Sequence, residues 1–356
     1  MKENELPLFE GLSDEHIEWA LRFFRLVEVD YGMRLIEEGE QDPTLLCVLE
    51  GELEIKTGDT QLGMAKPGDI VGEMALFGEG LRMASVEANT NSRLLLLDRT
   101  GYQQLRGVAS PVGRALEAFA LEQLMQRLAD TSDAIASLSE GTPAAVVAPQ
   151  KGFFASVRAL FGSGGPYKAH NVDIESVLRA VPFFMDATDE ALAEVATCLK
   201  AAGYASGSFL CTEGTIGQEM YILAKGLVEV LISTEGDRVE QLATLEPGDA
   251  FGMIALLDSR PRMASVVAKE AVTVLVLRLE QWQDLVAAFS PGGSAMRVAM
   301  IRCVSDQLAF ANAQLAQLEI VRHIEDTRPL KPLFMAEAHM EAHGRQLTPA
   351  EPVGRM

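Results

Sequence analysis

Short runs of alternating or continuous hydrophobic positions, separated by glycine, proline and polar residues, gather in two parts of the chain. In the first part these runs lie at 34–38, 44–51, 52–56, 61–66, 85–89 and 92–98, and in the second part at 220–226, 227–233, 240–245, 265–270 and 273–279. Short strands separated by turn residues at this spacing predict a β-sandwich or β-barrel in each part.

Helices are predicted at both ends of each strand-rich part. Each opening segment carries an acidic pair, Asp14–Glu15 or Asp189–Glu190, where negative charge in the first turn stabilises a helix through its dipole. In the first part, Pro111 precedes about 28 residues without proline or glycine beyond Gly113, which predicts a long closing helix.

The two parts are copies of one pattern. LPLFEGLSDE recurs as VPFFMDATDE with a spacing of 175, and KPGDIVGEMALFGEGLRMASV recurs as EPGDAFGMIALLDSRPRMASV with a spacing of 180. The change in spacing reflects a longer turn in the second copy, around ISTEGDRVEQ. A repeat of this kind predicts two related domains. We expect these domains at about 1–140 and 171–322, a linker with a short amphipathic segment at 141–170, and an acidic tail at 323–356.

Charge and composition narrow the classes of function. The formal net charge of -21 argues against nucleic acid or an anionic membrane as the main partner, because phosphates would be repelled over most of the surface. No apolar run reaches the 18 residues of a membrane-spanning helix, and the start of the chain does not resemble a secretory signal. The four cysteines form no CxxC pair, so we expect buried, inert thiols in a cytoplasmic protein.

The segment from Gly72 to Ser85, GEMALFGEGLRMAS, carries the most specific chemistry. Gly72 allows a close approach of backbone and ligand, and Glu73 can accept a ribose hydroxyl. The next residues can form one helical turn whose free N–H groups face an anion. The planar guanidinium of Arg82 can hold a phosphodiester through paired hydrogen bonds. These groups together predict a pocket for a nucleotide-like anion.

The order and spacing of this segment resemble the phosphate-binding cassette of cyclic nucleotide-binding domains. The LPLF opening, the Pro-Gly-Asp turn and the closing helix of the first copy are similar to the same family, particularly to the sensor half of catabolite activator proteins. The resemblance implies an α+β, mainly β fold, with two tandem eight-stranded jelly-roll barrels that are each flanked by helices. It also implies a ligand that is usually cAMP or cGMP.

Carried over residue by residue, the resemblance gives Glu73 the ribose and Arg82 the cyclic phosphate. The cassette backbone that surrounds the phosphate is Gly72, Met74, Ala75 and Leu76. Met83 stands where the family often has a hydroxyl residue or alanine, and the missing hydroxyl favours cAMP over cGMP. Thr131 and Ser132 match a pair that reaches the adenine amine in the catabolite activators, although Thr-Ser-Asp is also consistent with an ordinary break or cap in the helix.

The second copy departs from the pattern. It keeps Gly252, Ala255, Leu256 and Arg262. Met253 replaces the ribose-binding glutamate, and a thioether is a poor acceptor for the hydroxyl. The adenine pair aligns with Ala311 and Asn312. We therefore expect a degenerate second site that is structural or dimerising, or that binds weakly, with Arg262 paired to a nearby carboxylate.

Three other patterns leave alternatives open. Leu121, Leu124, Leu128, Ile135 and Leu138 follow an approximate heptad seam, which fits a helix packed on its own barrel or a dimeric coiled coil. The apolar face of 151–161 fits a helix between the domains or a partner-docking helix, and less readily a membrane anchor. His339 and His343 are four residues apart, but a solvated tail explains them better than a metal site.

These observations favour a stand-alone cAMP receptor that is not an enzyme and has no cofactor. We expect it to signal to an unidentified protein partner through its helices, which could also join two chains in a homodimer. The alternatives are a cAMP-responsive transcription regulator and the regulatory subunit of an enzyme. DNA binding is disfavoured because no basic recognition helix is visible. A tandem barrel with a purely structural role would leave Glu73 and Arg82 unexplained.

Overall fold

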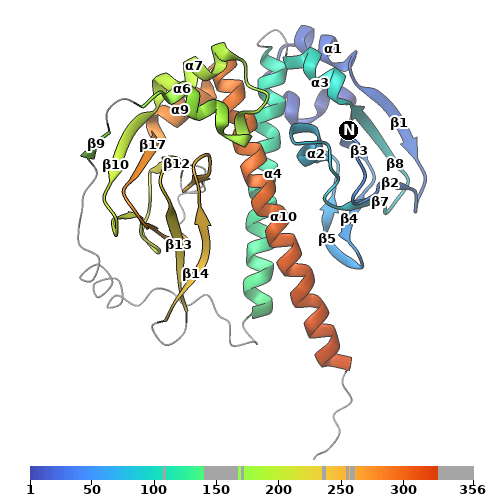
Figure 1. Ribbon diagram of the computed structural model, residues 1–356. Helices are drawn as coiled ribbons and strands as arrows, with labels where there is room; N and C mark the ends of the chain where they lie inside the picture. Colours follow the sequence, from blue (N-terminus) through green and yellow to red (C-terminus); the bar gives the residue numbers. More distant parts are fainter. Residues whose placement is uncertain are drawn as a thin grey trace, which may run out of the picture.

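The computed structural model describes residues 1–106, 110–139, 167–169, 172–234, 238–253, 256 and 261–327. Two β-domains lie on either side of a pair of long helices, α4 (Pro111–Ser139) and α10 (Pro291–Thr327), as Figure 1 shows. Amphipathic segments, glycine turns and capped helix starts produce the same order of elements in both copies.

The first domain has two four-stranded antiparallel sheets, in the orders β1-β8-β3-β6 and β2-β7-β4-β5. Their strands are β1 (Arg25–Val29), β2 (Arg34–Ile36), β3 (Leu45–Glu50), β4 (Leu53–Thr57), β5 (Thr60–Ala65), β6 (Ile70–Val71), β7 (Ser85–Ala88) and β8 (Ser92–Leu97). All of the strands that the hydrophobic runs predict in this copy are present. Two further strands, β1 and β6, were not among those runs.

The second domain repeats this topology. Its sheets have the orders β15-β12-β17-β10-β9 and β11-β16-β13-β14, which match the first domain strand for strand apart from the added β9. The strands are β9 (Tyr167–Lys168), β10 (Lys200–Tyr204), β11 (Phe209–Cys211), β12 (Glu219–Lys225), β13 (Val228–Thr234), β14 (Arg238–Leu245), β15 (Ala250–Phe251), β16 (Ser265–Ala268) and β17 (Val272–Arg278). The expected architecture of two tandem mainly-β barrels with flanking helices is confirmed.

One glycine turn shows why the repeat keeps certain residues. Gly51 has a φ of +88°, and a Cβ at this position would lie 2.1 Å from Oγ of Ser92. The corresponding Gly226 has a φ of +89°, with a Cβ position 2.8 Å from Cγ1 of Val272. Both turns therefore require glycine for its positive φ and its missing side chain.

The helices begin where the sequence places their signals. α1 (Asp14–Leu21) and α7 (Asp189–Cys198) start after Ser13 and Thr188, whose hydroxyls accept the N–H of the third residue that follows. Both acidic pairs lie in the first turn, as predicted. The other helices are α2 (Glu73–Phe77), α3 (Arg99–Arg106), α6 (Ile174–Ala180), α9 (Leu279–Ala287), and the 3-10 turns η1 (Glu3–Glu5), η2 (Pro7–Phe9) and η3 (Pro182–Phe184).

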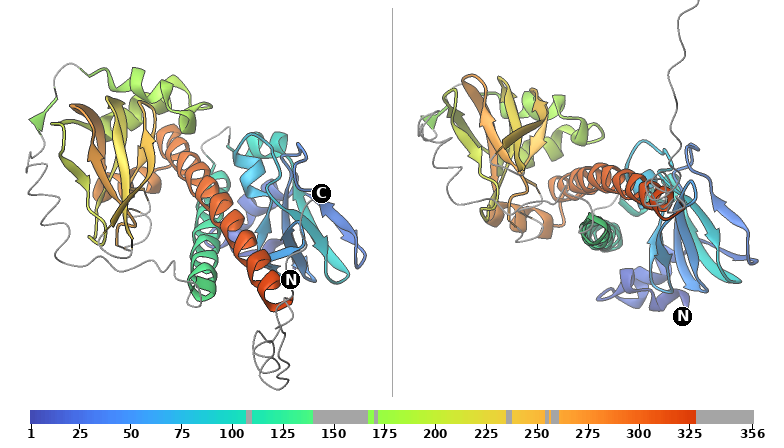
Figure 2. Two further views of the ribbon diagram at one scale, coloured as in Figure 1. Left: turned by 60° about the horizontal axis from the view of Figure 1, so that its bottom comes forward. Right: turned by 90° about the horizontal axis from the view of Figure 1, so that it is seen from below.

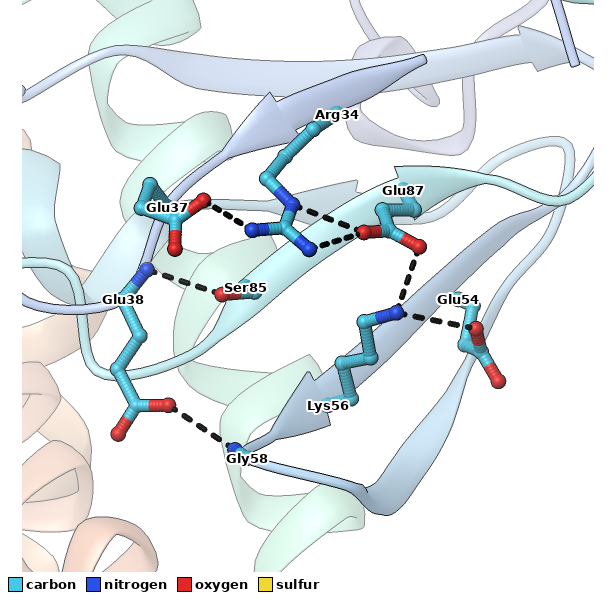
Figure 3. Close-up of polar contacts among 8 residues, drawn as sticks. All are labelled: Arg34, Glu37, Glu38, Glu54, Lys56, Gly58, Ser85 and Glu87. Carbon is cyan, nitrogen blue, oxygen red and sulfur yellow. Dashed lines mark hydrogen bonds and ion pairs between the residues drawn. The ribbon is translucent and has the colours of Figure 1, made fainter. Parts of the chain in front are cut away.

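An ion-pair ladder crosses the outer face of the sheet formed by β2, β7 and β4 (Figure 3). Arg34 donates to Glu87 at 2.6 and 2.8 Å, and Lys56 Nζ lies 2.6 Å from the other oxygen of Glu87. The pairs lower the pKa of the Glu87 carboxyl, first through the hydrogen bond from Lys56 and then through that from Arg34. Ladders of opposite charge join neighbouring strands at the surface.

The long helices α4 and α10 pack against each other between the domains (Figures 1 and 2). The core of the first domain includes Val298, Ile301, Val304 and Leu308 of α10, together with Leu124 of α4. The first half of the α4 seam is therefore covered within this chain by its own barrel and by α10, at Leu124 and at the partly buried Leu121 and Leu128. Ile135 and Leu138 are only partly buried.

Buried thiols occur in both domains, as expected. Burial raises the pKa of Cys303 to about 12 and that of Cys211 to about 11. Burial also raises the pKa of Cys47, whereas Cys198 is half-buried. Among the described residues, no helix is both long enough and apolar enough to cross a membrane.

Several predictions fall on residues outside the described part of the chain. They concern the amphipathic segment 151–161, most of the linker, Ala255, and the tail with His339 and His343. α10 continues to Thr327, a few residues beyond the expected end of the second domain at 322.

Candidate functional site

A cavity of about 250 Å³ lies in the first domain, against α2, α4 and α10. Its walls combine six charged or polar side chains with apolar ones from both sheets. They are Ile36, Ile55, Leu62, Gly63, Met64, Val71, Gly72, Glu73, Met74, Ala75, Arg82, Met83, Ala84, Val86, Arg127, Asp130, Thr131, Ala134, Leu308, Asn312 and Leu315. A mainly apolar pocket with a few converging polar groups is typical of a small-molecule site.

Gly72 makes the close approach of α2 and Arg82 possible. Its φ is +92°, and a Cβ here would lie 2.5 Å from both Nη1 of Arg82 and the carbonyl oxygen of Thr44. Glu73 begins α2 immediately afterwards. Glycine thus brings the carboxylate and the guanidinium to one cavity.

Arg82 is buried, with 4% of its surface exposed. Nη2 donates to Oδ2 of Asp42 at 3.0 Å, while Nε and Nη1 are buried without a hydrogen-bond partner. Partial burial raises the pKa of Asp42, but the hydrogen bonds from Thr44 and Arg82 together lower it by more. The pKa of Asp42 therefore lies below its usual value. Asp42 therefore holds one end of the guanidinium and leaves two donors for a ligand.

Glu73 is 1% exposed. Its Oε1 accepts a hydrogen bond from Nη1 of Arg127 at 2.7 Å, whereas Oε2 is buried without a partner. Arg127 also donates to the carbonyl of Ile70 at 2.5 Å, which fixes its position on the barrel. A buried polar atom without a partner costs about 1–3 kcal/mol, so the free atoms of Glu73 and Arg82 can be satisfied by polar groups that enter the cavity.

Helix α10 of the second copy completes the cavity of the first. Leu308, Asn312 and Leu315 line it, and the hydroxyl of Thr131 on α4 lies 3.2 Å from Oδ1 of Asn312. The repeat pattern had placed Asn312 in the second copy's own site. The alignment of Asn312 with Ser132 shows where Asn312 lies in the repeat, but it does not show which cavity the Asn312 side chain faces.

Two predicted residues lie away from the cavity lining. The hydroxyl of Ser132 donates to the carbonyl of Leu128 in the preceding turn at 2.6 Å. Leu76 is buried in the core, and its N–H donates to the carbonyl of Gly72 at 3.0 Å. The helix therefore runs without a break through Thr131 and Ser132, and only Thr131 of the pair reaches the cavity.

The residues that hold the two central side chains were not predicted from the sequence. Arg127 and Asp42 contact Glu73 and Arg82, and the second copy has lost both. Gln307 stands at the position of Arg127 and Gly217 at that of Asp42. The second copy thus lacks the glutamate, the Arg127 equivalent and the Asp42 equivalent together. This shared loss is the feature of the sequence that could have identified Arg127 and Asp42 as part of the site.

Arg262 has a different environment from Arg82. It donates to the carbonyls of Gly252 at 2.7 Å and Glu219 at 2.6 Å, rather than to the expected carboxylate. A Cβ on Gly217 would lie 2.2 Å from Nε of Arg262, so the guanidinium occupies the space that a side chain would need. Met253 is buried in the second core.

The second copy also has an open cavity of about 550 Å³ beside Arg262. Its lining consists of Leu210, Cys211, Thr212, Thr215, Ile216, Gly217, Gln218, Glu219, Tyr221 and Arg262. Met253 stands at the position of Glu73 and is buried in the core. The described lining of this cavity therefore has no carboxylate equivalent to that of Glu73.

Known proteins resemble this chain in both β-domains. A family model described as "Cyclic nucleotide-binding domain" matches residues 26–107 and 203–289. The chain is 26% identical over 272 residues to cGMP-dependent protein kinase 2 of Mus musculus, covering 74% of this chain and 28% of the kinase. It is 24% identical to the cAMP-dependent protein kinase regulatory subunit of Yarrowia lipolytica, covering 78% of this chain and 58% of the subunit.

One similar solved structure is the regulatory domain of Toxoplasma gondii PKA, crystallised with cAMP. Its sequence is 20% identical, and the TM-score is 0.31. The match covers 79% of this chain and 88% of that chain. The chain thus spans less than two thirds of the curated relatives named above. Both matched segments coincide with the two β-domains. The chain therefore carries two tandem domains of the cyclic nucleotide-binding domain family.

Proposed function

We propose that the first domain binds one cyclic nucleotide, preferentially cAMP, and that the second domain does not bind it with comparable affinity. The observation that carries this proposal is a single cavity with three buried polar atoms that lack partners, Oε2 of Glu73 and both Nε and Nη1 of Arg82. A ligand that supplies a hydroxyl to one side and an anion to the other would satisfy all three.

The chemistry of a cyclic nucleotide fits these two requirements. A ribose 2′-hydroxyl can donate to Oε2 of Glu73, while Oε1 stays bound to Arg127. The cyclic phosphate is a singly charged anion with oxygens that accept from Nε and Nη1 of Arg82. Charge-assisted hydrogen bonds of this kind are stronger than neutral ones, and burial strengthens them further.

The base would lie between the apolar wall and the two long helices. Thr131 and Asn312 offer hydroxyl and amide groups there, and an amide can both donate and accept. Met83 supplies a thioether where a hydroxyl would be needed to hydrogen-bond guanine. These features support cAMP over cGMP.

The same arrangement supports a regulatory role. A ligand that contacts α4 and α10 together binds better when the two helices are packed around it, so it shifts the population toward that packing. We propose that a protein partner reads this change and that the chain acts as a cytoplasmic receptor without catalytic activity of its own.

A second candidate is a regulatory subunit of a kinase. The observation that favours it is the similarity to the Yarrowia lipolytica regulatory subunit across 78% of this chain. This candidate shares the first cavity with the receptor and differs only in the identity of the partner.

Calorimetry with cAMP and with cGMP tests the proposed site. We expect one binding site per chain with tighter binding of cAMP, and a loss of about a hundred-fold or more in affinity for Arg82→Ala, because two charge-assisted hydrogen bonds disappear. The matched control Arg262→Ala removes an equivalent arginine whose donors already bind backbone carbonyls, and we expect it to leave affinity within about two-fold. Two equal sites, or no binding by the wild type, would contradict the proposal.

A further inference from the structure

A fully buried ion pair joins the two long helices at the boundary between the domains. Glu117 of α4 is 1% exposed and Arg297 of α10 is 3% exposed. Nε of Arg297 donates to Oε2 of Glu117 at 2.9 Å. This pair belongs neither to the nucleotide cavity nor to the surface ladder.

The surrounding groups satisfy both charges. The hydroxyls of Tyr102 and Ser294 donate to Oε1 of Glu117 at 2.9 and 2.7 Å, and Nη1 of Arg297 donates to the carbonyl of Val286 at 2.6 Å. Such a network specifies one arrangement, because either charge left unpaired in this position would be costly.

The two residues occupy the same position in the two copies. Glu117 and Arg297 are 180 residues apart, the spacing that also relates Arg82 to Arg262 and Pro111 to Pro291. Both prolines start their helices. In a two-fold symmetric pair, the residues on the axis meet their own equivalents, and Glu117 and Arg297 meet each other in this way.

That position decides which helices can pair. If α4 packed symmetrically against α4 of another chain, Glu117 would meet a second Glu117, and two α10 helices would place Arg297 against Arg297. Like charges buried in contact are strongly unfavourable. Besides Arg297, the other cation paired with Glu117 among the described residues is Arg106, whose Nε is 3.9 Å from Oε1 and outside hydrogen-bond distance. Because α4 carries the acidic residue and α10 the basic one, the repulsion between like charges is absent only when α4 pairs with α10.

We infer that Glu117 and Arg297 are specificity determinants that make the face of α4 accept the closing helix of the second copy and reject another first copy. By this pairing, the chain forms between its own two domains the contact that a symmetric homodimer would form between two chains. The partner that the α4 face fits is therefore α10, and the second copy is retained for this pairing even though its own site has lost the glutamate.

Charge-reversed variants of the full chain test the inference directly. Arg297→Glu creates within one chain the Glu–Glu contact of an α4–α4 pair, and Glu117→Arg creates the Arg–Arg contact of an α10–α10 pair. We expect each single variant to lower the folding equilibrium constant in urea titrations by about a hundred-fold or more. The double variant Glu117→Arg/Arg297→Glu restores opposite charges and should regain at least ten-fold over either single variant.

A matched control separates pairing from general sensitivity to charge. Glu122→Arg reverses an exposed charge on the same helix, and we expect it to change the folding constant by less than about three-fold. If the single reversals fail to fold, the milder variants Glu117→Gln and Arg297→Gln provide the same coupling measurement, and the double reversal must still fold.

Purely additive effects of the two reversals, or an unfolded double variant, would overturn the inference. The measurement needs no nucleotide, so it stands apart from the proposed binding function.

Discussion

At the scale of residues, the first cavity depends on how two charged side chains are held. Asp42 occupies one nitrogen of Arg82, and Arg127 occupies one oxygen of Glu73. Each supporting residue fixes its partner while leaving atoms free toward the cavity. The second copy carries Gly217 and Gln307 at these positions, and its arginine binds backbone carbonyls instead.

Arg127→Gln introduces into the first copy the residue that the second copy has. We expect the free energy of unfolding to fall by about 1–3 kcal/mol, because buried Glu73 loses its hydrogen-bond donor, and the affinity for cAMP to fall as the carboxylate loses its fixed orientation. Urea unfolding and calorimetry measure the two effects.

The control for this variant is Arg25→Gln, an exposed arginine on β1, which should change neither quantity appreciably. Unchanged affinity in Arg127→Gln would show that Glu73 does not depend on Arg127 for its position.

At the scale of elements, local pattern predicted what each segment becomes but not what it packs against. The alternating runs and glycine turns predicted most of the strands, although not β1 and β6, and the acidic pairs predicted the starts of α1 and α7. The hydrophobic seam of α4 left open whether its partner was its own barrel or another chain. A seam shows that a helix face is buried, and only the tertiary packing shows that its barrel and α10 bury it.

Helix α10 predicts an effect of the second copy on the first site. We expect Asn312→Ala to weaken cAMP binding by about two- to ten-fold, since it removes one polar group from the cavity wall and its contact with Thr131. The stability of the protein should change little, because Asn312 is half-buried. Calorimetry checks the affinity.

Phe310→Ala is the matched control, since Phe310 lies on the same helix with 67% of its surface exposed. If Phe310→Ala weakened binding as much as Asn312→Ala, α10 would act through its general packing rather than through a group that faces the ligand.

At the scale of the whole molecule, α10 links the first cavity to the second domain. Nε of Arg302 donates to the carbonyl of Phe77 at the end of α2 at 2.7 Å, and Nη1 donates to the carbonyl of Phe183 in η3 at 3.0 Å. The same guanidinium also pairs with Asp186. One side chain thus contacts the cassette helix of one domain and the opening helices of the other.

This link predicts which segments exchange their amide hydrogens more slowly when a ligand binds. With cAMP at about one hundred times its dissociation constant, binding stabilises the folded state by about 2.7 kcal/mol. We expect amide hydrogen exchange to slow in 305–318 of α10 as well as in α2 and α4, and to stay unchanged in the second domain's sheet of β13 and β14. Mass spectrometry of exchanged peptides measures this distribution.

The same protein without cAMP supplies the baseline for these exchange measurements. Slower exchange confined to the first domain would mean that α10 does not respond to the ligand.

The sequence by itself determined the repeat, the mainly-β class of both domains, the presence of Glu73 and Arg82 in one segment, and the loss of the glutamate at Met253. These features follow from spacing within short stretches, where backbone geometry limits which side chains can meet. Only the tertiary structure decided that Asn312 faces the first cavity, that Ser132 turns back to its own helix, and that Glu117 meets Arg297. The Thr131–Asn312 and Glu117–Arg297 contacts join residues 181 and 180 positions apart, and they depend on how two helices cross, which no local pattern specifies. Ser132 bonds within its own helix, but whether its helix turn faces the cavity also depends on that packing.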